Sequence, residues 1–285
     1  MNFSLNDKID KMYYTFKIRK GNGKYREISA PLDELKAAQN KVIEHLSYIK
    51  VARDAMGFIN DRSIITNARK HLNKPYLLNI DLENFFPTIT SDKVFNALIR
   101  EGVDEKLAKN ITTLCTLDGA LPQGAPSSPF LSNVVFKPID KKISKACKSV
   151  AYTRYADDIT LSGDKKDVLN AKKQVFDIIK FYGFKVNPGK IHGAKQAMRQ
   201  EVTGVVVNEK TNIKRDDLMR FRAKLHNLKC KILDGEIKTE DDILLKTGED
   251  LNKVRGYASF IYSANRKKGI YYKNKIKEIE RMLKS

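Results

Sequence analysis

Three aspartates follow hydrophobic segments of the sequence, and they are the main candidates in the chain for catalysis or metal binding. Asp81 follows Leu-Leu-Asn-Ile, whereas Asp157 and Asp158 separate the segment VAYTRY from the segment ITLS. If these segments are central strands of one sheet, the three carboxylates converge at one end of it. Like charges about 4 Å apart repel by about 4 kcal/mol at an effective dielectric of about 20. Such a cluster therefore needs protonation or a bound cation.

A hard divalent cation suits an all-oxygen cluster of this kind. Mg²⁺ takes oxygen ligands and bridges substrate phosphates, and Mn²⁺ suits the same ligands. Two ions on two aspartates would serve phosphoryl transfer, in which one activates the attacking hydroxyl and the other stabilises the leaving oxygen. A single Asp at a strand end is more often a cap or turn residue, and an Asp-Asp pair is more often a solvated turn. The joint placement after hydrophobic strands favours a metal site without establishing one.

The elements that must position these carboxylates alternate without strict βαβ regularity, which predicts a mixed α+β fold. A β-hairpin is expected over 14–30, around a Gly21-Asn22-Gly23 turn that supplies positive φ angles. The other predicted strands are 75–82, two strands around a tight turn within 149–162, 184–187 and 202–208. The predicted helices are 32–49, 91–117, 164–182, 215–233 and 251–283, and a loop over 121–133 runs into a further helix.

The composition indicates a globular protein with a polyanionic partner. The 285 residues, 41% hydrophobic and 31% charged, allow one large domain or two to three joined subdomains. Lys and Arg number 54 against 34 Asp and Glu, a net charge of +20, which favours nucleic acid or an acidic membrane surface as partner. No signal peptide or membrane span is expected, and three widely spaced cysteines fit a reducing cytoplasm.

Positive charge is densest in residues 251–285, which carry ten Lys or Arg and two Asp or Glu. Aromatic residues interleave with these cations. The segment is therefore either a solvated helix face or a nucleic-acid surface on which bases stack. The aromatic residues concerned are Tyr257, Phe260, Tyr262, Tyr271 and Tyr272.

Three segments in order resemble the polymerase motifs of reverse transcriptases. Residues 155–158 (YADD) resemble the YxDD turn, and residues 79–86 (NIDLENFF) resemble the first catalytic-aspartate motif. Residues 121–129 (LPQGAPSSP) resemble the loop that positions template and nucleotide. A four-letter YADD alone is a weak signal, but the ordered set is specific. The resemblance implies an RNA-directed DNA polymerase, a nucleotidyltransferase with Mg²⁺ as cofactor.

Two further matches resemble signatures of bacterial retron reverse transcriptases. Residues 67–71 (NARKH) fit the pattern NAxxH, and residues 202–204 fit VTG. The resemblance covers roughly residues 15 to 265. It implies a right-hand polymerase with fingers over 1–75, a palm of antiparallel sheet plus helices over 76–208, and a basic helical thumb over 209–285. Part of 91–120 is expected to pack toward the fingers.

The resemblance also implies roles around the metal ions. Asp81 and Asp157 are expected to bind both ions, with the Leu82 carbonyl as an extra oxygen ligand and Asp158 as the supporting carboxylate. Phe86 occupies the place of the aromatic steric gate, which excludes a ribose 2′-hydroxyl. The alternative is that Phe85 and Phe86 are both core residues.

Other residues are expected to bind the incoming dNTP. Lys24 and Arg26 lie on the predicted hairpin, where the family places its fingers, and would meet the β- and γ-phosphates. Gln123 and Gly124 match residues beside the nucleotide and template. Lys190 is expected near the leaving pyrophosphate, with an ordinary surface lysine as the alternative.

RNA and DNA contacts are expected in two regions. Asn67 and His71 belong to a segment outside the metal site, and we assign them to RNA contact or to local structure. The thumb is expected to grip the primer–template duplex and a hairpin of the cognate RNA, mostly through phosphate and 2′-hydroxyl contacts. The predicted thumb contacts are Arg215, Arg220, Arg222, Lys224, Arg255, Arg266, Lys267 and Lys268.

The resemblance implies a retron enzyme that copies part of a structured non-coding RNA into multicopy single-stranded DNA (msDNA). The primer would be an RNA 2′-hydroxyl, and the branched product would stay bound. Only about 80 residues follow residue 205, so we expect no fused RNase H; a host RNase H would remove the template. A separate effector protein would complete an anti-phage defence system. The alternatives are a group-II-intron-like enzyme using 3′-hydroxyl primers and a non-catalytic RNA/DNA-binding scaffold that restrains a partner.

Overall fold

The computed structural model describes residues 9–19, 21, 23, 25–247 and 250–284. Within it the chain forms two compact units, one of Met1–Ser63 and Pro75–Ala194 and the other of Ile64–Lys74 and Lys195–Ser285. The second unit begins before the predicted boundary at residue 209, because residues 64–74 and 195–208 belong to it together with the C-terminal helices. The assignment of fingers, palm and thumb stays a prediction.

The first unit begins with the predicted β-hairpin. Strand β1 (Tyr13–Arg19) pairs antiparallel with β2 (Tyr25–Pro31). Gly23 has a φ of +79°, as the predicted turn requires, while Asn22 and Lys24 lie outside the described residues. Helix α2 (Asp33–His45) follows and ends four residues before the predicted limit.

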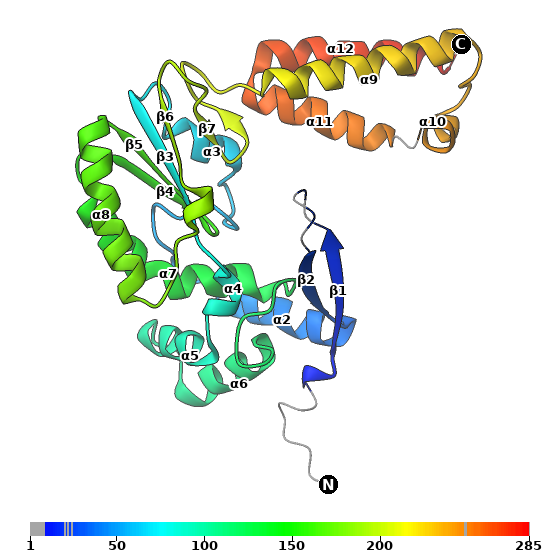
Figure 1. The fold of residues 1–285 in the computed structure, drawn as a ribbon. Helices are drawn as coiled ribbons and strands as arrows, with labels where there is room; N and C mark the ends of the chain where they lie inside the picture. Colours follow the sequence, from blue (N-terminus) through cyan, green and yellow to red (C-terminus); the bar gives the residue numbers. More distant parts are fainter. Residues whose placement is uncertain (1–8, 20, 22, 24, 248–249, 285) are drawn as a thin grey trace. The chain divides into compact units, whose positions relative to one another are not determined.

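A four-stranded sheet forms the centre of the first unit (Figure 1). Its strands are β3 (Tyr76–Asp81), β4 (Ala151–Tyr155), β5 (Asp158–Gly163) and β6 (His192–Lys195), in the order β4-β5-β3-β6. The strand predicted over 184–187 is wrong. Only Val186 bridges to Leu82 there, because the chain turns at once into a short 3₁₀ helix, η1 (Pro188–Lys190), and joins the sheet later as β6.

The core lies between this sheet and two helices, α7 (Ser127–Ala146) and α8 (Lys165–Phe181). Strand alternation places every second residue on one face, and the register pairs Leu78 with Leu161 and Ile80 with Ile159. These four side chains join the buried cluster that includes residues of both helices. Burying this apolar face fixes the register, since a slip of one residue would expose all four side chains.

The segment predicted as one helix over 91–117 is two helices. Helix α5 (Ser91–Arg100) and helix α6 (Glu105–Cys115) are separated at Gly102, whose φ is +84°. Side chains of Thr90 and Asp104 cap the two N-termini by accepting backbone N–H groups. A four-residue helix, α4 (Phe85–Thr88), precedes them and was not predicted.

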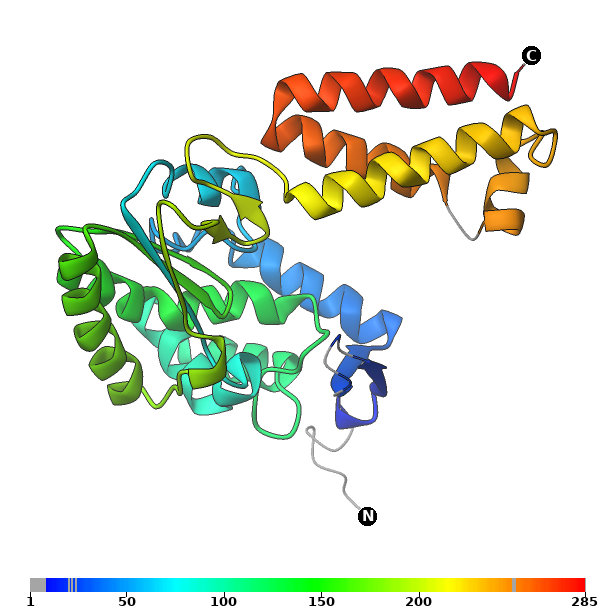
Figure 2. The ribbon, with the colours of Figure 1, turned by 45° about the horizontal axis from the view of Figure 1, so that its top comes forward.

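The second unit joins α3 (Ile64–Arg69) and a small hairpin, β7 (Glu201–Val202) and β8 (Val205–Val206), with the C-terminal helices (Figure 2). Helix α9 (Arg215–Leu233) matches its predicted bounds, and α10 (Glu240–Thr247) was not predicted. The predicted helix over 251–283 is two helices, α11 (Leu251–Ala264) and α12 (Arg266–Met282). Asn265 breaks it by adopting an extended conformation and capping α12 through Lys268 N–H.

The tight contact of α11 with α12 depends on Gly269. A Cβ atom at that position would lie 2.1 Å from Tyr262 Cα. In the described part of the chain, no helix is long and apolar enough to cross a membrane.

Candidate active site

The register of the central strands brings the predicted aspartates together. Asp81 at the end of β3 lies opposite Asp158 at the start of β5. The backbone N–H of Leu82 donates to the Asp157 carbonyl over 3.1 Å, which ties the end of β3 to the turn between β4 and β5. Ala156 in that turn has a φ of +55°, a left-handed conformation that is costly for a residue with a Cβ atom.

The electrostatics of this cluster match the repulsion expected from the sequence. Burial, together with the negative charges of Asp157 and Asp81, raises the pKa of Asp158 to about 6, although Lys190 opposes the shift. Burial also raises the pKa of Asp157, with Asp81 adding repulsion, while Lys190 and Arg26 oppose the shift. Arg26 on β2 therefore lies close enough to lower the pKa of Asp157.

Lys190 is the direct counter-ion of the cluster. Its Nζ lies 2.7 Å from Asp81 Oδ2, and this hydrogen bond raises the pKa of the lysine. Asn187, which the sequence analysis did not single out, also faces Asp81. Its backbone N–H donates to the Asp81 carbonyl over 2.8 Å, and its side-chain amide lies 3.4 Å from Asp81 Oδ1. The half-exposed Lys190 ammonium thus holds a place in which a cation is favourable.

The donor set fits a hard divalent cation that shares its ligands with a substrate. Carboxylate oxygens are the protein ligands that Mg²⁺ prefers. Burial, with smaller repulsion between the carboxylates, raises the pKa values of Asp157 and Asp158, and a bound cation would offset both effects. Within the described ranges, no group of three His, Cys, Asp or Glu side chains is placed to hold a metal by itself. Any bound ion would therefore take further ligands from backbone oxygen, water or nucleotide phosphate.

The loop before α7 is fastened to the hairpin. Ser29 N–H on β2 donates to the Gln123 carbonyl over 2.9 Å. Gly124 has a φ of +133°, and a Cβ atom there would lie 2.8 Å from both Ile28 Cγ2 and the Ser29 carbonyl oxygen. From the sequence, this glycine is predicted to lie beside the nucleotide and template. In the structure the close neighbour is β2, so glycine is needed for the loop to pack on the hairpin.

The two phenylalanines after Asp81 differ in burial. Phe85 is 4% exposed and packs against Phe136 and Phe184 in the core. Phe86 is partly buried and contacts Phe85 edge-on, with ring centroids 5.3 Å apart. Only Phe85 is a full core residue, so Phe86 remains the candidate for the steric gate.

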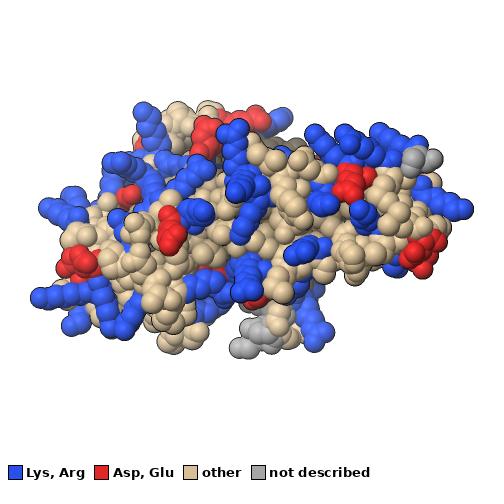
Figure 3. Space-filling view, turned by 90° about the horizontal axis from the view of Figure 1, so that it is seen from above, with Lys and Arg blue, Asp and Glu red and all other residues tan. Residues whose placement is uncertain are grey.

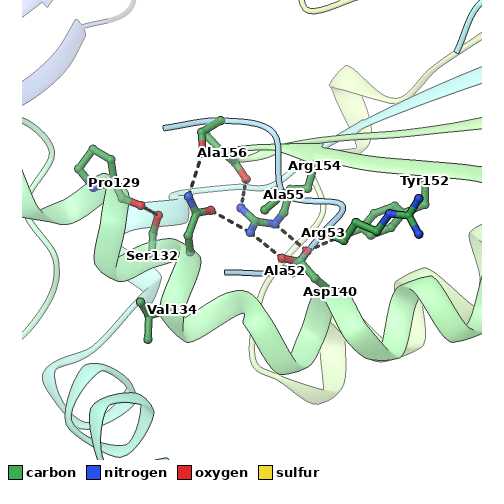
Figure 4. Close-up of polar contacts among 12 residues, drawn as sticks. Ala52, Arg53, Ala55, Pro129, Ser132, Val134, Asp140, Tyr152, Arg154 and Ala156 are labelled. Atoms are coloured by element: carbon green, nitrogen blue, oxygen red, sulfur yellow. Dashed lines mark hydrogen bonds and ion pairs between the residues drawn. The ribbon is translucent and has the colours of Figure 1, made fainter. Parts of the chain in front are cut away.

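Sequence reasoning missed a buried polar network beneath the aspartate turn (Figure 4). Arg154 is fully buried and forms an ion pair with Asp140 on α7, with Nη2 2.7 Å from Oδ2. Tyr152 donates to the same carboxylate over 2.6 Å. Alternation along β4 could have revealed it, because Tyr152 and Arg154 occupy the same face as Leu161 and Ile159. A charged residue among core positions needs a buried partner.

The retron-like motifs meet in the second unit. The side-chain amide of Asn67 on α3 lies 3.4 Å from Thr203 Oγ1, in the turn between β7 and β8. Asn67 is 1% exposed and His71 is 0% exposed. Burial lowers the pKa of His71 to about 3, with a smaller effect from Lys70 and Lys74. Their burial argues against direct RNA contact by these side chains and favours the alternative assignment to local structure.

Several of the residues predicted as thumb contacts already pair with other residues of the second unit. Arg255 pairs with Glu280 at 2.7 Å and Glu240 at 3.0 Å, so its charge is already neutralised locally. Arg220 pairs with Asp217, and Lys268 donates to Asn212. Of the other predicted contacts, four are exposed and one is half-buried; the exposed ones are Arg215, Arg222, Arg266 and Lys267, and the half-buried one is Lys224.

A hollow lined by basic residues lies between α9 and α12. Arg222 and His226 line it from α9, and Tyr271 and Lys275 line it from α12. Glu278 sits among these cations and its pKa is lowered to about 2 by hydrogen bonds from Lys229 and Lys275. Seen from above, Lys and Arg outnumber Asp and Glu over the visible surface (Figure 3).

The fold and the carboxylate site define a polymerase of the reverse transcriptase class. Residues 18–233 match the family described as "Reverse transcriptase (RNA-dependent DNA polymerase)". Among solved structures, apo telomerase from Candida tropicalis is similar with a TM-score of 0.55 at 12% identity, covering 95% of this chain and 62% of the telomerase. The foamy viral protease-reverse transcriptase in complex with double-stranded DNA is similar with a TM-score of 0.54 at 16% identity, covering 95% and 43%. These likenesses confirm the right-hand polymerase fold.

Curated relatives narrow the family. The chain is 34% identical to the retron Ec86 reverse transcriptase of Escherichia coli, over 89% of this chain and 76% of that protein. It is 35% identical to the retron Ec83 enzyme of Escherichia coli, over 88% and 82%. It is 31% identical to the retron Mx162 enzyme of Myxococcus xanthus, over 94% and 61%. The chain belongs to the retron reverse transcriptases, and its activity is that of an RNA-directed DNA polymerase.

Proposed function

We propose that the protein copies part of a structured non-coding RNA into branched msDNA, starting from an RNA 2′-hydroxyl. The observation that carries this proposal is the contact of Asn67 with Thr203, which joins the two retron-like motifs in one small structure. A shared local structure gives both motifs a reason to occur together, and it lies in the same compact unit as the basic helices. A group-II-intron-like enzyme with 3′-hydroxyl primers is the second candidate.

We propose a two-metal mechanism at the aspartates. Asp81 and Asp157 would hold two Mg²⁺ ions, or Mn²⁺, with the Leu82 carbonyl as a further ligand and Asp158 in support. When bound, the ions activate the attacking hydroxyl and stabilise the leaving oxygen. Because Lys190 already neutralises Asp81, its ammonium would be released toward the pyrophosphate when a cation takes over this role.

The remaining dNTP contacts follow from the hairpin and the loop. Arg26 would meet the triphosphate, since its charge already reaches Asp157. Lys24, which lies outside the described residues, is proposed for the same role. Gln123 and Gly124 would flank the nucleotide where the loop meets β2, and Phe86 would exclude a ribose 2′-hydroxyl.

Partners are proposed from the family resemblance and the charge. The exposed cations of the thumb would bind the cognate RNA and the msDNA product through phosphates. A host RNase H would remove the copied template. A separate effector protein and a role in anti-phage defence complete the proposal, in the cytoplasm.

The test is the nucleic acid that the protein retains. The chain is expressed with its native upstream DNA, purified at moderate salt, and its nucleic acid is run on a denaturing gel after RNase, DNase or a 2′,5′-debranching enzyme. We expect a discrete species that RNase shortens, DNase removes and debranching separates into RNA and DNA. RNA alone, together with no DNA synthesis after addition of Mg²⁺ and dNTPs, would refute the proposal.

A matched variant separates the enzyme from a scaffold. Replacing Asp157 and Asp158 by Asn preserves size and removes the negative charges. We expect this variant to retain RNA but carry no DNA. A DNA product that cannot be debranched would favour the group-II-intron-like alternative. A cellular function that survives the double substitution would favour the scaffold.

A further inference from the structure

We propose that Arg154 is a positioning residue for polymerisation, which holds the aspartate turn in place against α7. The proposal rests on the role of Asp157 given above. Arg154 lies two residues before Ala156 in the turn, and its guanidinium does not face the carboxylates of Asp157 and Asp158. It reaches instead beneath the turn, where its Nη1 donates to the Ala156 carbonyl over 3.0 Å.

The Ala156 carbonyl matters because this residue sets the direction of the turn. Ala156 lies between Tyr155 and Asp157 and has a φ of +55°. An L-residue holds that conformation only when its surroundings impose it. The hydrogen bond from Arg154 is one such constraint, and it acts on the peptide group that joins Ala156 to Asp157.

The guanidinium is itself held rigidly by α7. Its Nε and Nη2 donate to the two oxygens of Asp140 over 2.8 and 2.7 Å, and Nη2 also donates to Asn133 Oδ1 over 3.0 Å. Its Cζ lies 4.4 Å from the centre of the Phe136 ring. All of these groups belong to α7, so a helix rather than a loop holds the turn in position through Arg154 (Figure 4).

Asn133 extends this support to the other side of the turn. Its amide donates to the Gly57 carbonyl over 2.9 Å. A Cβ atom on Gly57 would lie 3.0 Å from the Ala156 nitrogen and 3.1 Å from Tyr155 Cδ1, so the backbone at Gly57 presses directly on the turn. The segment before it is fixed by Arg154 as well, since Arg154 N–H donates to the Asp54 carbonyl and Met56 N–H donates to the Arg154 carbonyl.

Lysine could not replace this arginine. The side chain serves two carboxylate oxygens, an amide oxygen and a backbone carbonyl at once, which requires the planar fork of a guanidinium. An ammonium placed against Asp140 would keep the buried charge pair but leave the Ala156 carbonyl without its donor. Arg154→Lys therefore keeps the positive charge that Asp140 requires and removes the hydrogen bond to the Ala156 carbonyl.

The test compares Arg154→Lys with Tyr152→Phe as matched control. Tyr152 donates to the same Asp140 carboxylate over 2.6 Å, but within the described part of the chain its side chain forms no hydrogen bond to residues 155–158. Single-nucleotide incorporation is measured on an RNA template with an annealed DNA primer, as functions of dNTP and Mg²⁺ concentration, together with thermal unfolding. Wild type and Asp157→Asn are run beside them, so that a failure of the proposed function appears as inactive wild type or active Asp157→Asn.

We expect Arg154→Lys to lower the maximal rate at least tenfold, to raise the Mg²⁺ concentration needed for half-maximal rate, and to change the dNTP KM less than threefold. Tyr152→Phe is expected to stay within threefold of wild type in rate. A rate loss in Arg154→Lys no greater than in Tyr152→Phe, or a loss confined to KM, would overturn the proposal.

A second variant decides the matter if Arg154→Lys does not fold. Asn133→Ala keeps the Arg154–Asp140 pair and removes the bridge to Gly57. We expect a folded protein with a rate reduced three- to tenfold and an unchanged dNTP KM. A wild-type rate in Asn133→Ala would refute the positioning role.

Discussion

The buried His71 predicts how the stability of the protein depends on pH. The histidine is fully buried, and burial lowers its pKa from 6.5 to about 3, with a smaller effect from Lys70 and Lys74. In the unfolded chain the same imidazole binds a proton below about pH 6.5. Between pH 6.5 and 3 the unfolded state therefore binds more protons, and the free energy of unfolding falls as the pH falls.

The size of the effect follows from the two pKa values. Relative to neutral pH, His71 should lower the free energy of unfolding by about 0.8 kcal/mol at pH 6 and by about 2 kcal/mol at pH 5, since one pKa unit corresponds to about 1.36 kcal/mol. Glutamine at this position keeps a donor and an acceptor but does not titrate. His71→Gln should therefore lose about 2 kcal/mol less stability than wild type between pH 7.5 and pH 5.

The assay is urea unfolding followed by far-ultraviolet circular dichroism at pH 7.5, 6 and 5. Carboxylates also titrate over this range, but they are common to both proteins and cancel in the difference between them. Parallel pH dependences in wild type and His71→Gln would refute the reasoning, because a histidine that can be protonated in place has no buried structural role.

Three other predictions concern the active site. Asp157→Asn should reduce nucleotide incorporation at least a thousandfold, because it removes a proposed metal ligand. Its melting temperature should stay within a few degrees of wild type, since the substitution removes one of the negative charges that raise the pKa of Asp158. Incorporation above one per cent of wild type would contradict the proposed role of Asp157. Gly124→Ala should lower activity and the melting temperature, because its Cβ would lie 2.8 Å from Ile28 Cγ2 and the Ser29 carbonyl oxygen. A wild-type activity and melting temperature would show that the loop can move away from β2. Phe86→Ala should increase incorporation of ribonucleotides relative to deoxyribonucleotides by tenfold or more in a competition assay, and an unchanged ratio would assign the ring to packing alone.

The parts of the fold that sequence predicted best are those fixed by short-range patterns. The hydrophobic runs before Asp81 and around Asp157 gave strands whose pairing places the aspartates opposite each other. The helix over 215–233 has its predicted bounds because its leucines follow helical spacing. In these segments the local pattern and the tertiary packing agree.

The errors arose where a few residues override such a pattern. The apolar residues of 184–187 suggested a strand, but η1 follows at once and leaves one bridge. A continuous helical pattern spans 251–283, yet the extended conformation of Asn265 divides it. Backbone angles of single residues of this kind depend on packing that the sequence does not display.

The sequence predicted those site residues that lie in short motifs, such as the aspartates, and missed those that lie outside them. The register placed Asp81 and Asp158 together, but the sequence offered no motif for Asn187 or for Arg154 with Asp140. Asn187 is 106 residues from Asp81 in the sequence, and Arg154 and Asp140 lie on different elements, a strand and a helix, which the fold packs together. The NAxxH and VTG segments gave a family signal without revealing that Asn67 and Thr203 touch.

The second unit combines segments that are far apart in the sequence, and this has a consequence for biosynthesis. Helix α3 leaves the ribosome early, but the strands β7 and β8 that cover it are made about 130 residues later. During that interval helix α3, whose Ile65 and Ala68 are buried in the finished protein, lacks its contacts with β7 and β8. A chain released before residue 206 would keep its aspartates yet present this apolar helix to the cell's quality-control proteases. The stability of α3 therefore depends on residues 201–206, which are synthesised much later than the helix itself.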